Sequence, residues 1–344
     1  MKGSVIALGQ IGERDVAALM QDGLLQDLAL EIDGLAPGAI LRGKVGRPVK
    51  GLGGVFVDLP DGQRGFLRQP KGLAPGQPVL VQVSGVAEPG KALPLVLRLL
   101  FKSRYAIITP GAPGLNISRA IRDEDLRAGL EGIASAAMQD ADEQLGLILR
   151  SVCDAAESDE IAEDIAQMRA LAEAVLADTS GAPELLVDAP GPHELAWRDW
   201  GDVDDVDTGD GALEHCGALD QIEALMQAEV SLEFGGMMTI EATRALVAVD
   251  VNTGADTSPA AGLKASLAAA RDLPRQLRLR GLGGIVVIDL APCPKRDRHV
   301  VEQVLGKTFR ADAGEANLAG WTPLGNFELT RKRDRQSLAE WMQA

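Results

Sequence analysis

Two apolar runs that each end in an aspartate, with a helical segment between them, constrain the fold of this chain most. ALVAVDVNTG places Asp250 at the end of one predicted strand, and GIVVIDLA places Asp289 at the end of another. The segment 263–281 between them has helical periodicity. A strand–helix–strand connection puts its strands in one sheet, in most cases parallel. We therefore expect both carboxylates at the carboxyl edge of that sheet, where open α/β folds bind ligands.

This edge is suited to a metal ion. A charged aspartate at the end of an apolar strand is costly unless it is paired or binds metal, and two neighbouring carboxylates repel each other until a divalent cation lies between them. Oxygen ligands favour Mg²⁺, with Mn²⁺ as an alternative, over zinc. Such a site activates water for attack on a phosphodiester. In the alternative interpretation, Asp250 and Asp289 form turns or cap the helices that follow them.

Basic residues gather in three clusters around the two aspartates. A polyanion held beside a metal needs such clusters, although they also cap helix C-termini and solvate exposed faces. The net charge of −16 argues against simple coating of nucleic acid, but its excess lies in residues 101–212, so a basic groove elsewhere is compatible with it. The clusters are Arg275, Arg278 and Arg280; Lys295, Arg296 and Arg298; and Arg331, Lys332, Arg333 and Arg335.

Residues 36–100 predict a small closed barrel, because short β-rich runs alternate there with glycine and proline turns. Phe56 and Phe66 lie on strands that flank a DG turn. Aromatic side chains on neighbouring strands can stack on successive bases, worth about 1–3 kcal/mol each. The alternative is that both fill the barrel core. The basic residues around them are Lys44, Arg47, Lys50, Arg64, Arg68, Lys71 and Lys91.

The other segments carry less information. Residues 1–35 predict two strands, SVIAL and LLQDLALEI, with a turn or helix over GERDVAALMQDG between them. Strands and helices alternate over residues 101–185, and residues 199–211 are expected to form an acidic linker. No apolar run approaches the ~18 residues that a membrane span needs. Three scattered cysteines predict reduced thiols in a cytoplasmic protein, without a cysteine zinc site.

Several of these runs resemble one family. GGMMTIEATRALVAVDVNTGA, RDLPRQLRLRGLGGIVVIDL and ELTRKRDRQSL are similar to the catalytic region of the ribonuclease E/G family, and the NTGA and TRKR variants are nearer its ribonuclease G branch. GVFVDLPDGQRGFL resembles the family's S1-type RNA-binding barrel, and KSRYAIITPGAPGLNISRAI with LGLILRS resembles its 5′-end sensor. Members of this family are divalent-metal endoribonucleases. They cut single-stranded RNA in processing or decay and leave a 5′-phosphate and a 3′-hydroxyl.

The resemblance implies an α/β fold with an inserted S1-type OB-fold barrel. Residues 1–35 and 186–225, the latter with the acidic linker, would form an RNase H-like subdomain around the barrel of residues 36–100. Residues 101–185 would form the 5′-sensor-like region. Residues 226–344 would form the DNase I-like catalytic subdomain.

The resemblance also implies roles for particular residues. Asp250 and Asp289 would hold Mg²⁺, and Asn252 would position the scissile phosphate or the attacking water. RNA would be held by Phe56, Phe66 and Lys91, and from the residues themselves we add Arg275, Arg278 and Arg280. Arg150 and Ser151 would contact a 5′-monophosphate.

The sequence departs from the family at several places. It ends before the cysteine pair that clamps zinc between subunits and before the small dimerisation domain. We therefore expect no zinc. The resemblance implies single-stranded RNA as the partner, and no membrane is expected. A homodimer is compatible with the sequence, and a zinc-linked tetramer is not expected. Pro292 stands where an acidic residue is usual, Ser103 where glycine is common, and Glu315 near a basic sensor position. These departures leave an alternative function, a family member that binds RNA and cuts it weakly or not at all.

Overall fold

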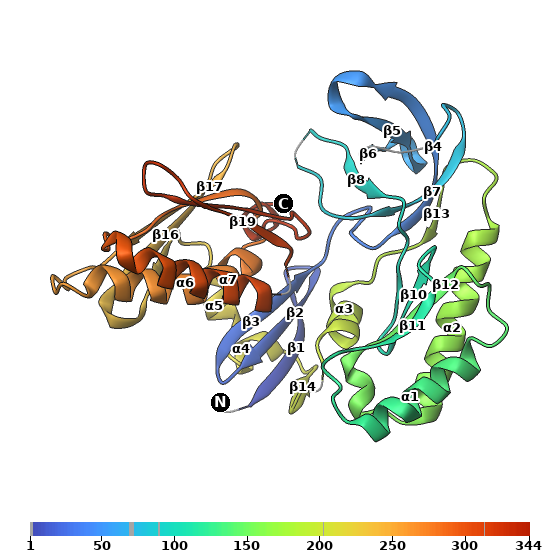
Figure 1. The fold of residues 1–344 in the computed structure, drawn as a ribbon, viewed down its shortest axis with the longest axis horizontal. Helices are drawn as coiled ribbons and strands as arrows, with labels where there is room; N and C mark the ends of the chain where they lie inside the picture. Colours follow the sequence, from blue (N-terminus) through green and yellow to red (C-terminus); the bar gives the residue numbers. More distant parts are fainter. Residues whose placement is uncertain (1–2, 69–71, 89, 202, 313) are drawn as a thin grey trace. The chain divides into compact units, whose positions relative to one another are not determined.

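The computed structural model describes residues 3–68, 72–88, 90–201, 203–312 and 314–344 (Figure 1). The chain divides into two compact units. The first unit consists of residues 1–30 and 205–344, and the second consists of residues 31–204. Each unit has its own sheets and its own hydrophobic cores.

One sheet of the first unit joins the N-terminal strands to a strand from far along the chain. Its order is β14-β1-β2-β3, with β14 parallel to β1 and the other pairs antiparallel. Short helices cover one face, where Val16, Met20 and Ile222 are among the core residues. The elements are β1 (Ser4–Ile11), β2 (Arg14–Gln21), β3 (Leu24–Leu30), β14 (Asp205–Asp207), α4 (Ala212–His215), α5 (Ala218–Ala224) and α8 (Leu338–Trp341).

Two sequence expectations for this region are wrong. The segment expected to be a turn or a helix contains strand β2, because tight turns at Gly12 and Gly23 place it between β1 and β3, and pairing on both sides outweighs its helix-forming alanines. The acidic segment 199–211 is not a linker throughout. Its residues Asp205–Asp207 form β14 and pair with Val5–Ala7 of β1.

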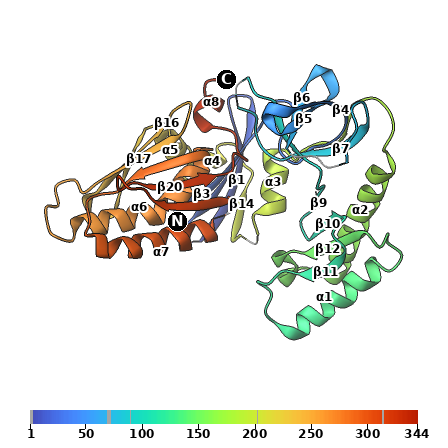
Figure 2. The same cartoon turned by 45° about the horizontal axis from the view of Figure 1, so that its top comes forward.

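The second sheet of the first unit has helices packed on one of its faces (Figure 2). Its order is β15-β16-β17-β18-β20-β19, and β17 and β18 are parallel. Alanines of α6 and apolar residues of α7 pack on inward residues such as Val249 and Ile288. The elements are β15 (Glu229–Ser231), η4 (Glu233–Gly235), β16 (Met237–Ala242), β17 (Val247–Asn252), α6 (Ala261–Leu279), β18 (Gly284–Asp289), η5 (Lys295–Asp297), α7 (Arg298–Ala311), β19 (Ala316–Trp321) and β20 (Phe327–Arg331).

The second unit contains the predicted closed barrel. β4 pairs with both β5 and β7, so the strand order β4-β5-β6-β8-β7 closes on itself. β13 lies outside this ring and pairs antiparallel with the start of β4. Inward valines and leucines fill it, among them Val57 and Val81. The elements are β4 (Ile40–Val49), η1 (Lys50–Leu52), β5 (Gly54–Asp58), η2 (Pro60–Gly62), β6 (Arg64–Arg68), β7 (Pro78–Val83), β8 (Leu93–Val96) and β13 (Glu184–Val187).

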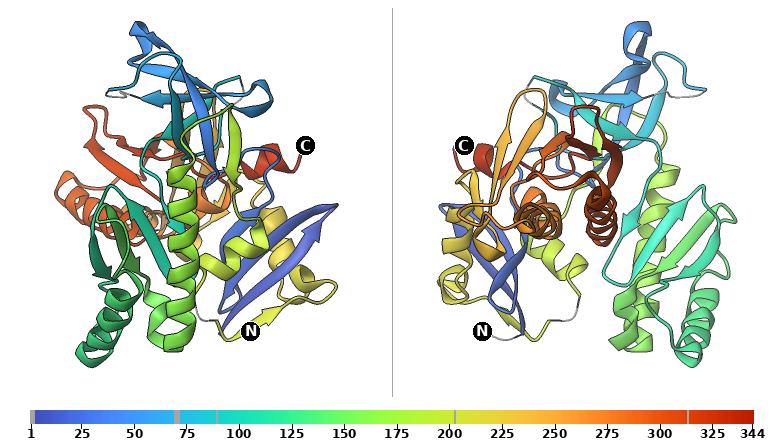
Figure 3. Two further views of the ribbon diagram at one scale, coloured as in Figure 1. Left: turned by 90° about the vertical axis from the view of Figure 1, so that its right-hand side faces the viewer. Right: turned by 60° about the vertical axis from the view of Figure 1, so that its left-hand side comes forward.

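A second sheet in this unit has the order β11-β12-β10-β9. Helices α1 and α2 lie side by side against it (Figure 3), and Leu147, Leu149 and Ile165 belong to their shared core. The strands and helices predicted for residues 101–185 are confirmed. In the described parts of the chain, no helix is long and apolar enough to cross a membrane. The elements are β9 (Phe101–Lys102), β10 (Ala106–Pro110), β11 (Gly114–Ile117), α1 (Glu124–Ala137), β12 (Leu145–Leu149), η3 (Ser151–Ala155), α2 (Ser158–Ala177) and α3 (Pro192–Asp199).

Candidate functional site

The two candidate aspartates lie directly opposite each other. Strands β17 and β18 pair in parallel, and the register aligns Asp250 with Asp289. Both side chains are exposed, whereas the alternate residues Val249 and Ile288 are buried under α6 and α7. The strand–helix–strand prediction is therefore confirmed, because the connection through α6 brings both carboxylates to one face at the carboxyl edge of the sheet.

Asn252 belongs to the same edge. Its side-chain amide Nδ2 donates a hydrogen bond of 2.6 Å to Oδ2 of Asp250. The two residues are two positions apart on one strand, so they share a face. This hydrogen bond fixes the orientation of the Asp250 carboxylate relative to its partner across the strands.

The register adds a carboxylate that the sequence did not reveal. Glu328 of β20 pairs with Val287, which lies two residues before Asp289 on β18. Directly paired residues share a face of an antiparallel sheet, so Glu328 lies on the Asp289 face, one step diagonally along it. The sequence signal for it is the alternation in FELTR, where Glu328 stands between the apolar residues Phe327 and Leu329.

The donor set at this edge fits a hard divalent cation. Across the described ranges, no group of three His, Cys, Asp or Glu side chains is placed to hold a metal ion. Mg²⁺ commonly takes one or two carboxylates from the protein and completes its shell with water and substrate phosphate oxygens. Asp250 and Asp289 supply such a pair of carboxylates.

The first basic cluster differs from the expectation that it contacts RNA. Arg275 donates to Asp272 and to the carbonyl of Leu25, and the side chain of Arg278 is 13% exposed beside Asp27 and Asp312. Arg280 is buried and donates to the carbonyls of Leu225 and Gln227. These guanidinium groups join α6 to neighbouring parts of the first unit, so the structure gives them a packing role.

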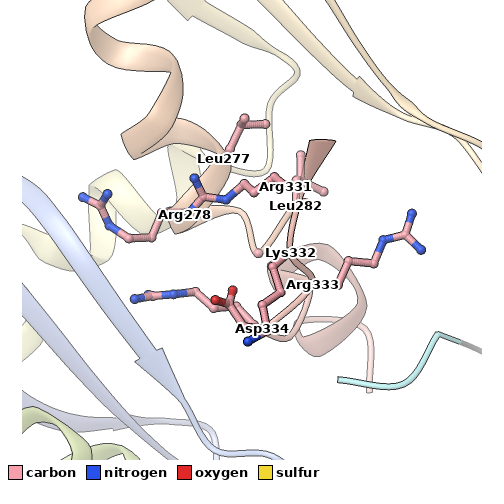
Figure 4. Close-up of a pocket in the computed structure, with 9 residues that line it drawn as sticks. Leu277, Arg278, Leu282, Arg331, Lys332, Arg333 and Asp334 are labelled. Carbon is pink, nitrogen blue, oxygen red and sulfur yellow. The ribbon is translucent and has the colours of Figure 1, made fainter. Parts of the chain in front are cut away.

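The C-terminal basic cluster also spreads over several protein partners. Figure 4 shows Arg278 and Arg333 extending in opposite directions from a small pocket that Arg331 and Lys332 help to line. Arg331 is buried and pairs with Asp312, and Arg333 donates to the carbonyl of Gly283 at 3.1 Å. This cluster does not converge on one exposed surface.

The cluster after Asp289 is the one that stays exposed. Lys295 and Arg296 lie in η5, between β18 and α7, and the Arg296 side chain is 85% exposed. Arg298 instead stacks over the ring of Trp321, with its guanidinium carbon 4.5 Å from the ring centroid. Lys295 and Arg296 are therefore exposed basic side chains in the segment that follows Asp289.

Phe56 and Phe66 form an aromatic pair on the outside of the barrel. They are paired in register on β5 and β6, with ring centroids 5.4 Å apart in an edge-to-face arrangement. Both are half-buried, and they alternate with the buried residues Val57 and Leu67. The alternative that they fill the barrel core is therefore wrong. The Phe66 ring lies over Gly54, where an added Cβ would come within 2.6 Å of its Cζ.

Exposed basic residues share the strand of Phe66, and a further one lies on the loop before β8. Arg64 and Arg68 flank Phe66 at two-residue spacing on β6, and so share its outward face. Lys91 is exposed, with its ammonium 2.8 Å from a Glu88 carboxylate oxygen. Lys71 and the side chain of Lys50 lie outside the described residues. The outer face of β5 and β6 is therefore aromatic and basic.

The predicted 5′-phosphate contact has a protein partner that the sequence did not indicate. The Arg150 guanidinium donates to the carbonyls of Ser103 and Arg198 and, at 2.8 Å, to the Asp199 carboxylate. Burial raises the pKa of Asp199, but hydrogen bonding and charge from Arg198 and Arg150 outweigh it and leave that pKa lowered. Ser151 is exposed at the start of η3.

The fold and the site together define a mixed α/β protein with a closed barrel and an aspartate pair at the carboxyl edge of a parallel strand pair. The sequence model of the Ribonuclease E/G family matches residues 101–208 and 202–334, which together cover well over half of the chain. The chain belongs to the ribonuclease E/G family, and the resemblance drawn from its motifs is confirmed.

Individual relatives agree with this assignment. The chain is 28% identical to ribonuclease E of Nostoc sp. over 95% of its own length and 56% of that protein. It is 27% identical to ribonuclease G of Salmonella typhimurium, over 93% of its length and 78% of the relative. Ribonuclease E of Escherichia coli is 28% identical over 94% of this chain and 36% of that protein. The chain thus spans about half of the Nostoc relative and a larger share of ribonuclease G.

Proposed function

We propose that this chain is an endoribonuclease that uses Mg²⁺, or Mn²⁺ in its place, to hydrolyse single-stranded RNA in RNA processing or decay. The products would carry a 5′-phosphate and a 3′-hydroxyl. The observation that carries the proposal is the in-register pair of exposed carboxylates, Asp250 and Asp289. The similarity to ribonuclease E and ribonuclease G supports the same reaction.

Asp250 and Asp289 would hold the metal ion between the two strands. Bound there, the ion would supply positive charge to the phosphate and lower the pKa of a bound water. The chain's own groups do the positioning. Asn252 donates one amide hydrogen to Asp250, and because a carboxamide has a second hydrogen to donate, that hydrogen is available to a phosphate oxygen at the same edge.

RNA binding would draw on exposed groups in each unit. On the barrel, Phe56 and Phe66 offer rings for stacking, with Arg64 and Lys91 near the phosphates. In the first unit, Lys295 and Arg296 lie in η5, in the segment between Asp289 and α7. Stacking accepts any base, and phosphate contacts carry no sequence information. This combination predicts broad specificity for single strands and binding that weakens as salt rises.

Arg150 and Ser151 are the proposed contact for a 5′-monophosphate. The Asp199 carboxylate already accepts a hydrogen bond from Arg150, so an incoming phosphate competes with a negative group for the same guanidinium. We therefore infer that this chain distinguishes a 5′-monophosphate from a 5′-hydroxyl only weakly.

The test is cleavage of a short, 5′-monophosphorylated, A/U-rich single-stranded RNA in Mg²⁺ and in EDTA. The parent chain is compared with Asp289→Asn, which keeps the side-chain shape and removes the charge. Glu302→Gln is the matched control, since Glu302 is exposed on α7, on the covered side of the same sheet. We expect internal cuts that require Mg²⁺, disappear in Asp289→Asn and persist in Glu302→Gln.

Two results would contradict the proposal. If Asp289→Asn cuts RNA like the parent, the carboxylate pair does not take part in cleavage. Salt-sensitive RNA binding by the parent without any metal-dependent product would identify a family member that binds RNA and does not cut it.

A further inference from the structure

One aromatic side chain is exposed at the carboxylate edge. Phe234 lies in η4, between β15 and β16, and is 68% exposed. The chain's other phenylalanines, all within the described ranges, are buried or half-buried. Exposure of a large apolar side chain gives no stability from burial, so packing in the first unit does not account for this residue.

The backbone at Phe234 is also in an unfavourable conformation. Its φ is 64° and its ψ is 19°, the left-handed region, which costs a residue with a Cβ about 1–2 kcal/mol. The turn is held closed by the Leu232 amide, which donates to the carbonyl of Gly236 at 2.8 Å. Strained residues persist where the surroundings over-determine them, and such positions cluster at functional sites.

The turn packs backbone to backbone against the segment that carries Asn252. A Cβ added to Gly254 would lie 2.2 Å from the carbonyl oxygen of Gly235, and one added to Gly236 would lie 3.1 Å from the carbonyl oxygen of Asn252. Without side chains at these two glycines, the turn approaches the end of β17 closely. Phe234 is thereby held next to the loop that follows Asp250 and Asn252.

A second apolar side chain lies between the turn and the site. Met237 is 36% exposed and pairs directly with Asn252 across β16 and β17, so it projects from the face that carries Asp250. Phe234 and Met237 are thus two exposed apolar side chains beside the carboxylate pair. An exposed ring at this position is adjacent to where a phosphodiester would bind, and the chemical group next to a phosphodiester in RNA is a nucleobase.

We propose that Phe234 is a base-stacking residue that receives a nucleobase flanking the scissile phosphate. The inference rests on the proposed function and deepens it by assigning a nucleotide contact within the first unit, beside the carboxylate pair. Stacking needs a π-face and no particular hydrogen-bond pattern, so the ring positions the strand for any base. The larger surface of a purine favours its binding there. The alternative is that the Phe234 ring contacts a protein partner, and the test below distinguishes this from base stacking.

The test uses single-stranded RNA oligonucleotides in EDTA, each with one 2-aminopurine at a successive position, so that binding is observed without cleavage. Phe234→Asn removes the ring and suits the left-handed backbone, because asparagine adopts it readily. Phe234→Tyr keeps the ring. Leu324→Asn is the matched control, since Leu324 is 91% exposed in the same unit and carries no ring.

We expect the parent to quench 2-aminopurine most strongly at a defined position relative to the cut. Phe234→Asn loses that quenching and binds about 5- to 150-fold more weakly, the range for one lost stacked base. Phe234→Tyr restores both, and Leu324→Asn matches the parent. In Mg²⁺, loss of the ring raises KM and spreads the cut sites. The thermal midpoint of Phe234→Asn is expected to be no lower than the parent's, because the substitution relieves the backbone.

Parent-like quenching and affinity in Phe234→Asn would overturn the inference, as would a failure of Phe234→Tyr to restore them. Absence of any position-specific quenching in the parent would also overturn it and leave the ring to a protein partner. These results are distinguishable from failure of the proposed function. The binding assay needs no cleavage, and loss of cutting in Asp289→Asn is a separate observation.

Discussion

Replacing Phe66 by alanine isolates the contribution of the barrel to RNA binding. Phe66 is half-buried on the outer face of β6, paired edge to face with Phe56 at 5.4 Å and lying over Gly54. Arg64 and Arg68 share its face and are untouched by the substitution. The variant therefore removes one stacking surface and leaves the neighbouring charges in place.

Two free energies follow from this geometry. One lost stacked base weakens RNA binding by about 1–3 kcal/mol, or about 5- to 150-fold in Kd. Loss of the edge-to-face pair lowers the free energy of unfolding of the barrel by roughly 0.5–1.5 kcal/mol, in addition to the lost burial. The binding loss must therefore be separated from a loss of folded protein. Val57→Ala is the matched control, because Val57 is buried on the inner face of the adjacent strand and its loss destabilises the barrel without changing the outer face.

The assay is fluorescence anisotropy with a labelled single-stranded RNA over a series of salt concentrations. Phe66→Ala is expected to shift the plot of log Kd against log salt to weaker binding without changing its slope, because stacking releases no counterions. Arg68→Ala is expected to reduce the slope by about 0.7 if it contacts one phosphate. Unchanged affinity in Phe66→Ala, or an equal loss in Val57→Ala, would refute the argument that the outer aromatic pair binds RNA.

Three further outcomes test the charges and thiols of the chain. Asp312→Ala leaves two largely buried arginines, Arg278 and Arg331, without their shared carboxylate. Urea unfolding is therefore expected to show a free energy of unfolding lower by about 3–5 kcal/mol, whereas Glu315→Ala, at an exposed residue, has little effect. Equal effects of the two substitutions would contradict a stabilising role for the Asp312 ion pairs. Cys153 is buried and its pKa is raised to about 11, chiefly by desolvation, so it is expected to resist a thiol reagent at pH 8 until the chain unfolds; rapid native labelling would contradict its burial. The pKa of Asp199 is lowered in the folded chain, so its ionised form adds stability above its unfolded pKa of about 3.9, and this is lost as pH falls through the lower folded value. Asp199→Asn is therefore expected to melt below the parent at pH 7 and to converge with it in acid, and a constant difference across pH would exclude the ion pair with Arg150.

The parts of the fold that the sequence predicted are those with a strong local signal. The runs that end in Asp250 and Asp289 are apolar, β-branched and joined by a segment of helical periodicity, so their parallel pairing followed from chain connectivity. The barrel followed from regularly spaced turns. The segment that forms β2 lacked such a signal, because RDVAALMQ suits a helix as well as a strand until neighbouring strands pair with it on both sides.

The composition of the site was predictable, and the pairing of its charges was not. The sequence places basic residues at the C-terminal end of α6, but it does not show that Asp27 and Asp312 lie against Arg278 or that backbone carbonyls accept from Arg280. Charge patterns give the number of cations in a region, whereas their availability to RNA depends on distant partners. Phe234 was missed for the same reason, since its exposure and its left-handed backbone are properties of the folded turn.

The most direct test of the central claim is a comparison of single-turnover cleavage by Asp250→Asn, Asp289→Asn and the double variant in saturating Mg²⁺. The account predicts that each single substitution abolishes cutting while RNA affinity persists, and that the double variant loses no more than either single one. Groups that act as one unit are non-additive in this way. Modest losses that multiply in the double variant, or parental rates in either single variant, would contradict a shared site between β17 and β18.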